Sequence, residues 1–171
     1  NKVPKMFKNL MSTIGNTLRE SGEKGRVRLS SEFTIALNTE LEKSPKDERP
    51  ALLSIIDLLA MNDQTAVIVD FKSNLRGLED YKKQVHFYAM MAKFRFPSLT
   101  RVETYLAGIN ENQIMHIGSH QTANMTKESL RDFLISMFDF TCASPSMQYN
   151  PRKNKYCKYC PHRGMCPVFV K

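Results

Sequence analysis

Two acidic residues and a lysine lie in neighbouring apolar runs of this chain. Asp70 and Lys72 end the run Val67-Ile68-Val69, and Asp57 interrupts the apolar run 52–59. An ionised carboxylate is costly in apolar surroundings unless a cation pairs with it. Two carboxylates and a lysine that meet at the edge of the core therefore favour a divalent metal site with a cation beside it, and such sites hydrolyse phosphodiesters.

The two runs can meet as a hairpin. The segment 61–64, Met-Asn-Asp-Gln, separates them and has the composition of a turn. With an even-length loop centred in this turn, Asp57 lies opposite Ile68. Side chains two apart along a strand share one face of the sheet, so Asp57, Asp70 and Lys72 then project from the same face. A slip by one residue would turn Asp57 to the other face, and the prediction therefore depends on the register.

A helix is predicted downstream of this hairpin. Apolar and aromatic residues recur every three or four residues from Leu78 to Phe96, and Pro97 ends the pattern. Gln84 and Tyr88 are four residues apart and lie on one side of this helix. Taken alone, the pair is what an ordinary helix face shows. After Asp-x-Lys, it completes a set of three motifs.

These three motifs resemble those of the PD-(D/E)XK nuclease superfamily, and more narrowly those of its RecB-type branch, which includes CRISPR-adaptation nucleases and many phage exonucleases. That branch has Gly-x-x-Asp, Asp-x-Lys and Gln-x-x-x-Tyr in this order. Ser54 stands where the glycine usually is, which is a mild departure. The resemblance assigns the catalytic site to Asp57, Asp70, Lys72, Gln84 and Tyr88.

The resemblance also implies cofactors, substrate and mechanism. Asp57, Asp70 and the backbone carbonyl of Phe71 would hold Mg²⁺ or Mn²⁺, Lys72 would orient water or stabilise charge on the phosphate, and the helix motif would position the nucleotide. The expected enzyme is a metal-dependent deoxyribonuclease, an exonuclease rather than an endonuclease. Its substrate would be single-stranded DNA or DNA ends in recombination, repair or phage replication, with a helicase or recombination protein as partner.

One position departs from the RecB-type pattern. Many members carry a metal-binding histidine on an N-terminal helix, where this chain has Arg19, and a guanidinium does not ligate metal. Glu20 or Glu32 would then supply a carboxylate, or water would complete the coordination of Mg²⁺. The departure supports an alternative, a degenerate nuclease fold that serves as a DNA-binding or assembly subunit. The intact charge cluster argues against it, because a scaffold has no use for such a cluster.

The C-terminal part contains the spacing Cys-x2-Cys-x5-Cys. Clustered cysteines in a chain without a signal peptide indicate metal more than disulfides. The resemblance implies a structural 4Fe–4S cluster, which needs four thiolates and would clip the tail onto the core. The candidate ligands are Cys142, Cys157, Cys160 and Cys166. The fourth thiolate could instead come from a missing N-terminal segment; zinc, completed by His162 or Cys142, and unmetallated cysteines are the competing readings.

Composition agrees with a DNA-binding domain. The 171 residues are 42% hydrophobic, which excludes a mostly disordered chain, and no apolar run reaches the roughly 18 residues of a membrane span. We therefore expect no membrane partner and a reducing compartment, such as the cytoplasm of a bacterial, archaeal or phage-infected cell. The net charge of +8 favours a polyanionic partner. The basic residues expected to contact DNA are Lys82, Lys83, Arg152, Lys153, Lys155 and Lys158.

The expected order of elements is α-β-β-β-α-β-β-α. Periodicity and turn signals place them as helices at 4–20, 78–96 and 126–141 and as strands at 29–38, 51–60, 65–72, 101–108 and 113–118. This order predicts an α/β fold with a mixed central sheet flanked by helices, and the resemblance implies that it is a restriction-endonuclease-like core. We expect a nuclease core at 1–148 and a basic, cysteine-rich tail at 149–171, packed on the core as a metal clip.

Overall fold

A computed structural model describes residues 5–20, 26–45 and 48–138 of the chain. The chain divides into two compact units, Asn1–Arg131 and Asp132–Lys171. The first unit contains the five strands described below and the helices α1 and α2. Helix α3 (Lys127–Phe138) runs across the division. None of the described helices is long and apolar enough to cross a membrane.

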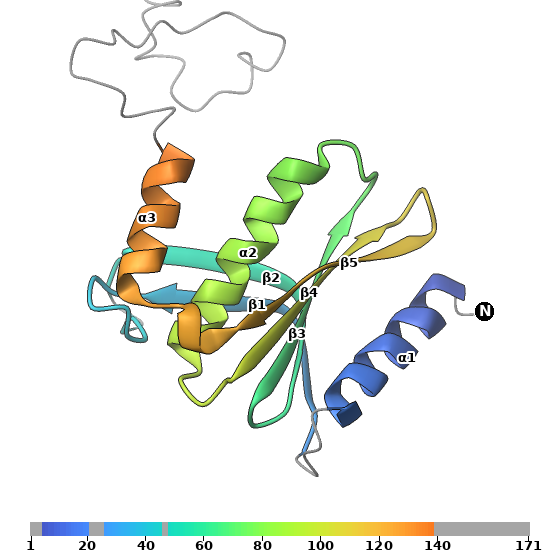
Figure 1. Ribbon diagram of the computed structural model, residues 1–171, viewed down its shortest axis with the longest axis horizontal. Coiled ribbons are helices and arrows are strands. Elements are labelled where there is room, and N and C mark those ends of the chain that lie inside the picture. The colour runs from blue at the N-terminus through green and yellow to red at the C-terminus, as the bar shows by residue number, and fades with distance from the viewer. Residues whose placement is uncertain (1–4, 21–25, 46–47, 139–171) are drawn as a thin grey trace, which may run out of the picture. The chain divides into compact units, whose positions relative to one another are not determined.

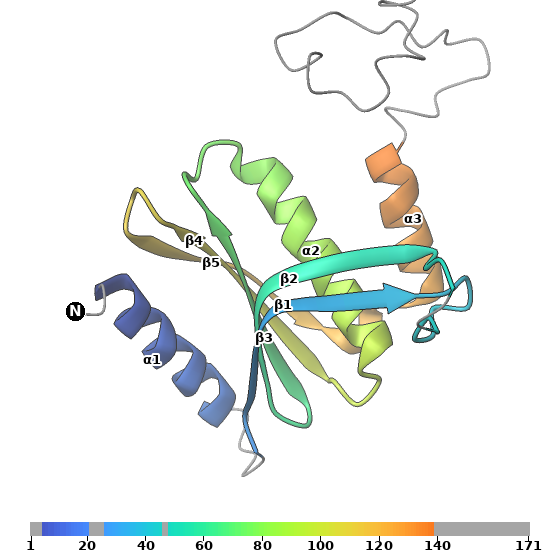
Figure 2. The ribbon, with the colours of Figure 1, turned by 180° about the vertical axis from the view of Figure 1, so that it is seen from behind.

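Five strands form one mixed sheet in the order β1-β2-β3-β4-β5 (Figures 1 and 2). Their bounds are β1 Arg28–Leu37, β2 Leu52–Met61, β3 Thr65–Lys72, β4 Arg101–Gly108 and β5 Gln113–Gln121. Neighbouring strands are antiparallel except β3 and β4, which are parallel. A parallel pair needs a crossover, and helix α2 (Leu78–Arg95) provides it. The predicted order of elements and the mixed sheet are confirmed for the described residues.

Helices α1 (Lys5–Glu20) and α2 lie on opposite faces of the sheet (Figures 1 and 2). Helix α1 buries an apolar side chain at every fourth residue, which gives it one apolar face. That face packs against odd-numbered residues of β3 and β4, with Val67, Val69 and Tyr105 among them. Because both faces of the sheet are covered, β3 is buried along most of its length. Even-numbered residues of β3, including Asp70 and Lys72, therefore face the α2 side.

The hairpin of β2 and β3 has a register two residues away from the prediction. Ile68 pairs with Leu59, where Asp57 was expected. The prediction was wrong in the centre of the loop, which lies one residue further along the chain. A shift of two residues does not by itself turn a strand over, so this difference leaves Asp57 beside the end of β3, where it was expected.

Asn62 sets this register. Its backbone N–H donates to the Thr65 carbonyl (N···O 3.0 Å), which leaves a two-residue loop. Its buried side chain accepts the N–H of Thr65 at 2.7 Å and of Gln64 at 3.2 Å through Oδ1, and donates to the Leu18 carbonyl at 3.3 Å through Nδ2. One side chain therefore closes the hairpin and ties it to the last turn of α1.

We expect Asn62→Ala to lower the free energy of unfolding by about 1–3 kcal/mol, because it removes the acceptor of two backbone N–H groups at a buried position. Urea denaturation measures this loss. Asp63→Ala is the matched control, since Asp63 is exposed and its ion pair with Arg28 spans 3.9 Å, so its effect should stay below about 0.5 kcal/mol. Equal effects of the two substitutions would contradict the role given to Asn62.

Candidate active site

Asp70 and Lys72 form an ion pair at the end of β3. Asp70 Oδ2 lies 2.7 Å from Lys72 Nζ, and the two side chains are 3% and 18% exposed. The alternation of the strand turns both toward α2, where Lys72 Nζ donates to Gln84 Oε1 at 2.7 Å. Gln84 Nε2 in turn donates to the Tyr88 hydroxyl, also at 2.7 Å. The structure therefore joins the Asp-x-Lys and Gln-x-x-x-Tyr motifs in one hydrogen-bonded chain.

Asp57 reaches the same site from β2. Its Oδ2 accepts the backbone N–H of Phe71 at 2.8 Å, so its carboxylate is held at the residue between Asp70 and Lys72. The Phe71 side chain faces the other way and packs on the α1 side, with its ring centroid 5.9 Å from that of Phe7. Phe71 thus anchors the site to the core through its side chain and holds a catalytic candidate through its amide.

Tyr81 belongs to the site and was missed in the sequence. Lys72 Nζ lies 4.8 Å from the centre of the Tyr81 ring, close enough for a cation–π interaction. Tyr81 precedes Gln84 by one helical turn, so the same spacing rule that placed Gln84 and Tyr88 on one side could have found it. The ring covers the ammonium of Lys72 and helps to hold it in place.

Burial controls the protonation of this site. Removal from water raises the pKa of Asp70; the nearby Asp57 carboxylate raises it further, while the Lys72 ammonium opposes both. Burial also raises the pKa of Tyr88, so its hydroxyl keeps its proton. Since this hydroxyl accepts from Gln84 Nε2, its hydrogen points away from Gln84 and can be donated to another acceptor.

The chemistry of the donors suits a hard divalent cation. Asp70 Oδ2 is buried, and among the described residues its partner is the Lys72 ammonium, 2.7 Å away. Within the described ranges no group of three or more His, Cys, Asp or Glu side chains converges. Two carboxylates, with water and substrate oxygens as the remaining ligands, are a sufficient protein contribution for Mg²⁺. The residues present therefore fit Mg²⁺ or Mn²⁺ and offer nothing for a soft metal at this place.

The N-terminal helix does not supply a replacement for the missing histidine. Arg19 is folded back on α1, where Nε donates to Gly15 O at 2.9 Å and Nη2 to Asn16 Oδ1 at 3.0 Å. The helix covers the face opposite Gln84 and Tyr88. Neither of the acids considered for this role, Glu20 and Glu32, forms a three-acid group with Asp57 and Asp70 in the part of the chain that the structure describes.

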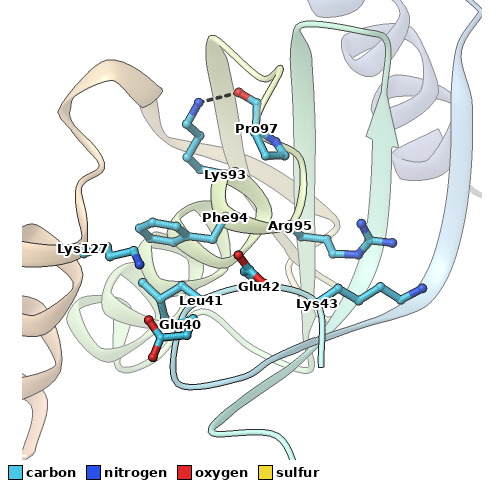
Figure 3. A pocket seen from close by; sticks show the side chains of 9 residues that line it. All are labelled: Glu40, Leu41, Glu42, Lys43, Lys93, Phe94, Arg95, Pro97 and Lys127. Atoms are coloured by element: carbon cyan, nitrogen blue, oxygen red, sulfur yellow. Dashed lines mark hydrogen bonds between the residues drawn. The ribbon is translucent and has the colours of Figure 1, made fainter. Parts of the chain in front are cut away.

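A pocket of about 460 Å³ lies beside the last turns of α2 (Figure 3). Of the predicted site residues that the structure describes, none lines it. The lining residues are Glu40, Leu41, Glu42, Lys43, Lys93, Phe94, Arg95, Pro97 and Lys127. Lys93 Nζ donates there to the backbone carbonyls of Pro97 at 2.7 Å and Leu99 at 3.1 Å, two acceptors in the turn that follows the helix. With acids and bases mixed on its wall, the pocket does not indicate a ligand.

The remaining predicted residues fall into two groups. Lys82 is ion-paired with Glu79 (Nζ···Oε1 2.7 Å), and Lys83 is exposed on the same helix. The others lie outside the described residues, namely Cys142, Cys157, Cys160, Cys166, Arg152, Lys153, Lys155 and Lys158. For these the sequence predictions stand as predictions.

Comparison with known proteins gives one family match. Residues 4–167 match the family model described as the PD-(D/E)XK nuclease superfamily. A solved structure titled "Crystal structure of SSO0001" aligns with 97% of this chain and 70% of its own, at 13% identity and a TM-score of 0.39. No curated protein matches the chain.

We expect Asp70→Asn to raise the midpoint of thermal unfolding at pH 7 by a few degrees, on the order of 1 kcal/mol, because it removes a buried charge that the fold tolerates at a cost. The raised pKa means that the folded chain binds this proton more tightly than the unfolded chain, so ionisation of Asp70 destabilises the fold as pH rises above its ordinary value of 3.8. The gain should therefore vanish as pH falls below that value. Thermal melts between pH 3 and 8 test this.

Asp63→Asn, at an exposed position, is the control for this series and should leave the midpoint unchanged. A lower midpoint of Asp70→Asn at pH 7 would mean that the lost pairing with Lys72 outweighs the cost of burial.

Proposed function

This chain belongs to the PD-(D/E)XK nuclease superfamily, and we propose that it is a metal-dependent nuclease that hydrolyses phosphodiester bonds in DNA. The observation that carries the proposal is the position of the Lys72 ammonium. It lies 2.7 Å from the buried carboxylate of Asp70 and 2.7 Å from Oε1 of Gln84 on α2. The side-chain amide of Gln84 donates in turn to the Tyr88 hydroxyl. A purely structural lysine has no need of so many partners at the end of a core strand.

In this proposal Asp57 and Asp70 hold the metal. When bound, Mg²⁺ or Mn²⁺ would polarise the scissile phosphate and make a water more acidic. Lys72 stabilises the negative charge that develops on the phosphate, and its fixed position means that little reorganisation is needed during the reaction. The backbone carbonyl of Phe71 remains a further candidate ligand, as the resemblance suggests.

Gln84 has a more specific role than substrate contact. Its carbonyl accepts from Lys72 and its amide donates to Tyr88, so it fixes the lysine and the tyrosine relative to each other. Tyr88 keeps its proton at neutral pH and can donate it to a phosphate or base oxygen of the nucleotide. We therefore infer that the main role of the helix motif is to position Lys72, and that contact with the substrate is its additional role.

The substrate class rests on the charge and the family resemblance. The net charge of +8 favours a nucleic acid partner, with Lys82 and Lys83 of α2 and the basic residues of 151–171 as its contacts. The RecB-type resemblance favours an exonuclease on single-stranded DNA or DNA ends, in recombination, repair or phage replication. A helicase or recombination protein is the expected partner.

A second metal site, at the cysteines of the C-terminal part, belongs to the proposal. The spacing of Cys157, Cys160 and Cys166, with Cys142 as fourth thiolate, supports a structural 4Fe–4S cluster, and zinc is the alternative. The cluster would hold the C-terminal tail and take no part in hydrolysis. These residues lie outside the described ranges, so the support is the sequence pattern.

We expect Lys72→Ala to lower the rate of DNA cleavage by about 10²–10³-fold, as loss of a donor that stabilises transition-state charge does elsewhere. Labelled single- and double-stranded DNA with Mg²⁺, Mn²⁺ or EDTA measures it. Mn²⁺ affinity by calorimetry should be equal or tighter than in the wild type, because the ammonium beside Asp70 Oδ2 is removed. Asp57→Ala and Asp70→Ala should abolish that binding.

Lys8→Ala is the control, since Lys8 is exposed on α1. Wild-type cleavage by Lys72→Ala would reject the site. DNA binding without cleavage by the wild-type protein in either metal would favour the alternative function, a degenerate fold that binds DNA or serves in an assembly.

If the four cysteines hold an iron–sulfur cluster, anaerobically purified protein should be brown, with broad absorption near ~400 nm. Cys157→Ser should bleach it, and the core should still bind metal at Asp57 and Asp70. Cys142→Ser identifies the fourth ligand, because colour that survives this change places that ligand elsewhere. Colourless protein with zinc by metal analysis would overturn the cluster in favour of zinc.

A further inference from the structure

One residue inside a strand has a backbone conformation that strands normally exclude. Three described residues other than glycine have positive φ, namely Glu32 at 49°, Leu41 at 63° and Asn112 at 51°. Leu41 and Asn112 lie in the connections between strands, where such values are expected. Glu32 lies within β1, and a left-handed conformation is unfavourable for a residue with a long side chain. Strain of this kind persists only where the surrounding structure imposes it, and it is concentrated at functional sites.

Glu32 lies at the one gap in an otherwise continuous ladder. Residues 28–37 of β1 pair with residues 52–61 of β2 in one register, with a partner for each position except Glu32. In that register the position opposite Glu32 is Asp57. The break in β1 therefore lies directly beside a proposed catalytic carboxylate.

Strand β2 changes face at this break. Phe33 contacts Phe96 at the end of α2, with ring centroids 5.8 Å apart, and Ile56 is its cross-strand partner, so both lie on the α2 side. Leu58 is two residues further along and should share that face in a regular strand. Instead it packs with the apolar cluster under α1. The reversal thus occurs at Asp57, between Ile56 and Leu58.

The same break separates β2 from β3. Their ladder ends at the pair of Leu58 and Val69. Continued in this register, Phe71 would face Ile56, but its N–H donates to the Asp57 carboxylate instead. A side chain has replaced the backbone as partner of β3 at the point where β2 turns away.

We propose that Glu32 is a positioning residue for the active site, and that it acts through its left-handed backbone. That conformation opens the ladder opposite Asp57 and lets β2 change face, so that the Asp57 carboxylate reaches the Phe71 amide beside Asp70. The exposed carboxylate of Glu32 takes no part. The inference rests on the proposed function for its catalytic consequence, whereas the geometry at Phe71 is independent of it.

Substitutions at position 32 can separate the effect of the backbone conformation from that of the carboxylate charge. Glu32→Gly and Glu32→Asn keep access to positive φ and remove the carboxylate, and Glu32→Gln removes the charge alone. Glu32→Val introduces a strand-forming side chain that disfavours positive φ, since a β-branched residue is an outlier there. Ser31→Val, at the exposed neighbouring residue, is the matched control for a valine in this strand.

Three measurements are made on each full-length variant: cleavage of labelled DNA with Mn²⁺, Mn²⁺ affinity by calorimetry, and hydrogen exchange of the Phe71 amide by NMR. We expect Glu32→Gly, Glu32→Asn, Glu32→Gln and Ser31→Val to match the wild type within about threefold, whereas Glu32→Val should lose about 100-fold in cleavage, as a misplaced catalytic group does. Glu32→Val should also bind Mn²⁺ more weakly and exchange the Phe71 amide faster.

Loss of Mn²⁺ affinity in the glycine, asparagine and glutamine variants would overturn the proposal in favour of a role for the carboxylate, and this result stands even if the valine variant does not fold. Wild-type behaviour of a folded Glu32→Val would also overturn it. If the wild type neither binds Mn²⁺ nor cleaves DNA, the proposed function fails, and exchange of the Phe71 amide still tests whether Glu32 positions Asp57.

Discussion

The buried carboxylate of Asp70 is the constraint on which the site depends. It lies at the end of the central strand β3, and with a side chain only 3% exposed it cannot be solvated by bulk water. A buried charge needs a counter-ion, and Lys72 provides one from the same face of the same strand. The lysine in turn needs partners that keep it there, which α2 supplies through Gln84 and Tyr81. Burial of one acid therefore explains why strand and helix are joined at this point.

Phe71 connects this site to the core. Its neighbours in sequence face α2, while its own ring packs on the α1 side, as the alternation of a strand requires. Its amide lies in the plane of the sheet and is taken by Asp57. One tripeptide thus presents an acid and a lysine to one helix, an aromatic ring to the other, and a hydrogen-bond donor to the neighbouring strand. On its other side, β3 is held along its length by its parallel pairing with β4.

A second buried carboxylate in the sheet, that of Glu103, has a different environment. Glu103 lies on the α1 side of β4 with a side chain 2% exposed, but Arg101, His116 and Ser119 all hydrogen-bond to it, and these bonds lower its pKa despite the burial. Its acceptors are satisfied by fixed protein donors. Asp70 differs because its pKa is raised: the effect of burial outweighs that of its hydrogen bond and ion pair with Lys72. That difference supports the proposal that Asp70 binds a metal.

The sequence by itself determined the elements and the face of Asp70 and Lys72, because these follow from local periods of two and 3.6 residues. Its motifs also indicated the superfamily, through their resemblance to those of known members. It did not determine the hairpin register, since the buried Asn62 side chain that closes the loop is also held by the Leu18 carbonyl, a contact distant in sequence. Helical spacing could place Tyr81 on the side of Gln84, but not over the Lys72 ammonium, and nothing in the sequence indicated that Glu32 adopts a positive φ opposite Asp57. Those features lie where helix α2 packs on β3 and where the β1–β2 ladder is interrupted, and only the tertiary structure decides which side chains meet at such places.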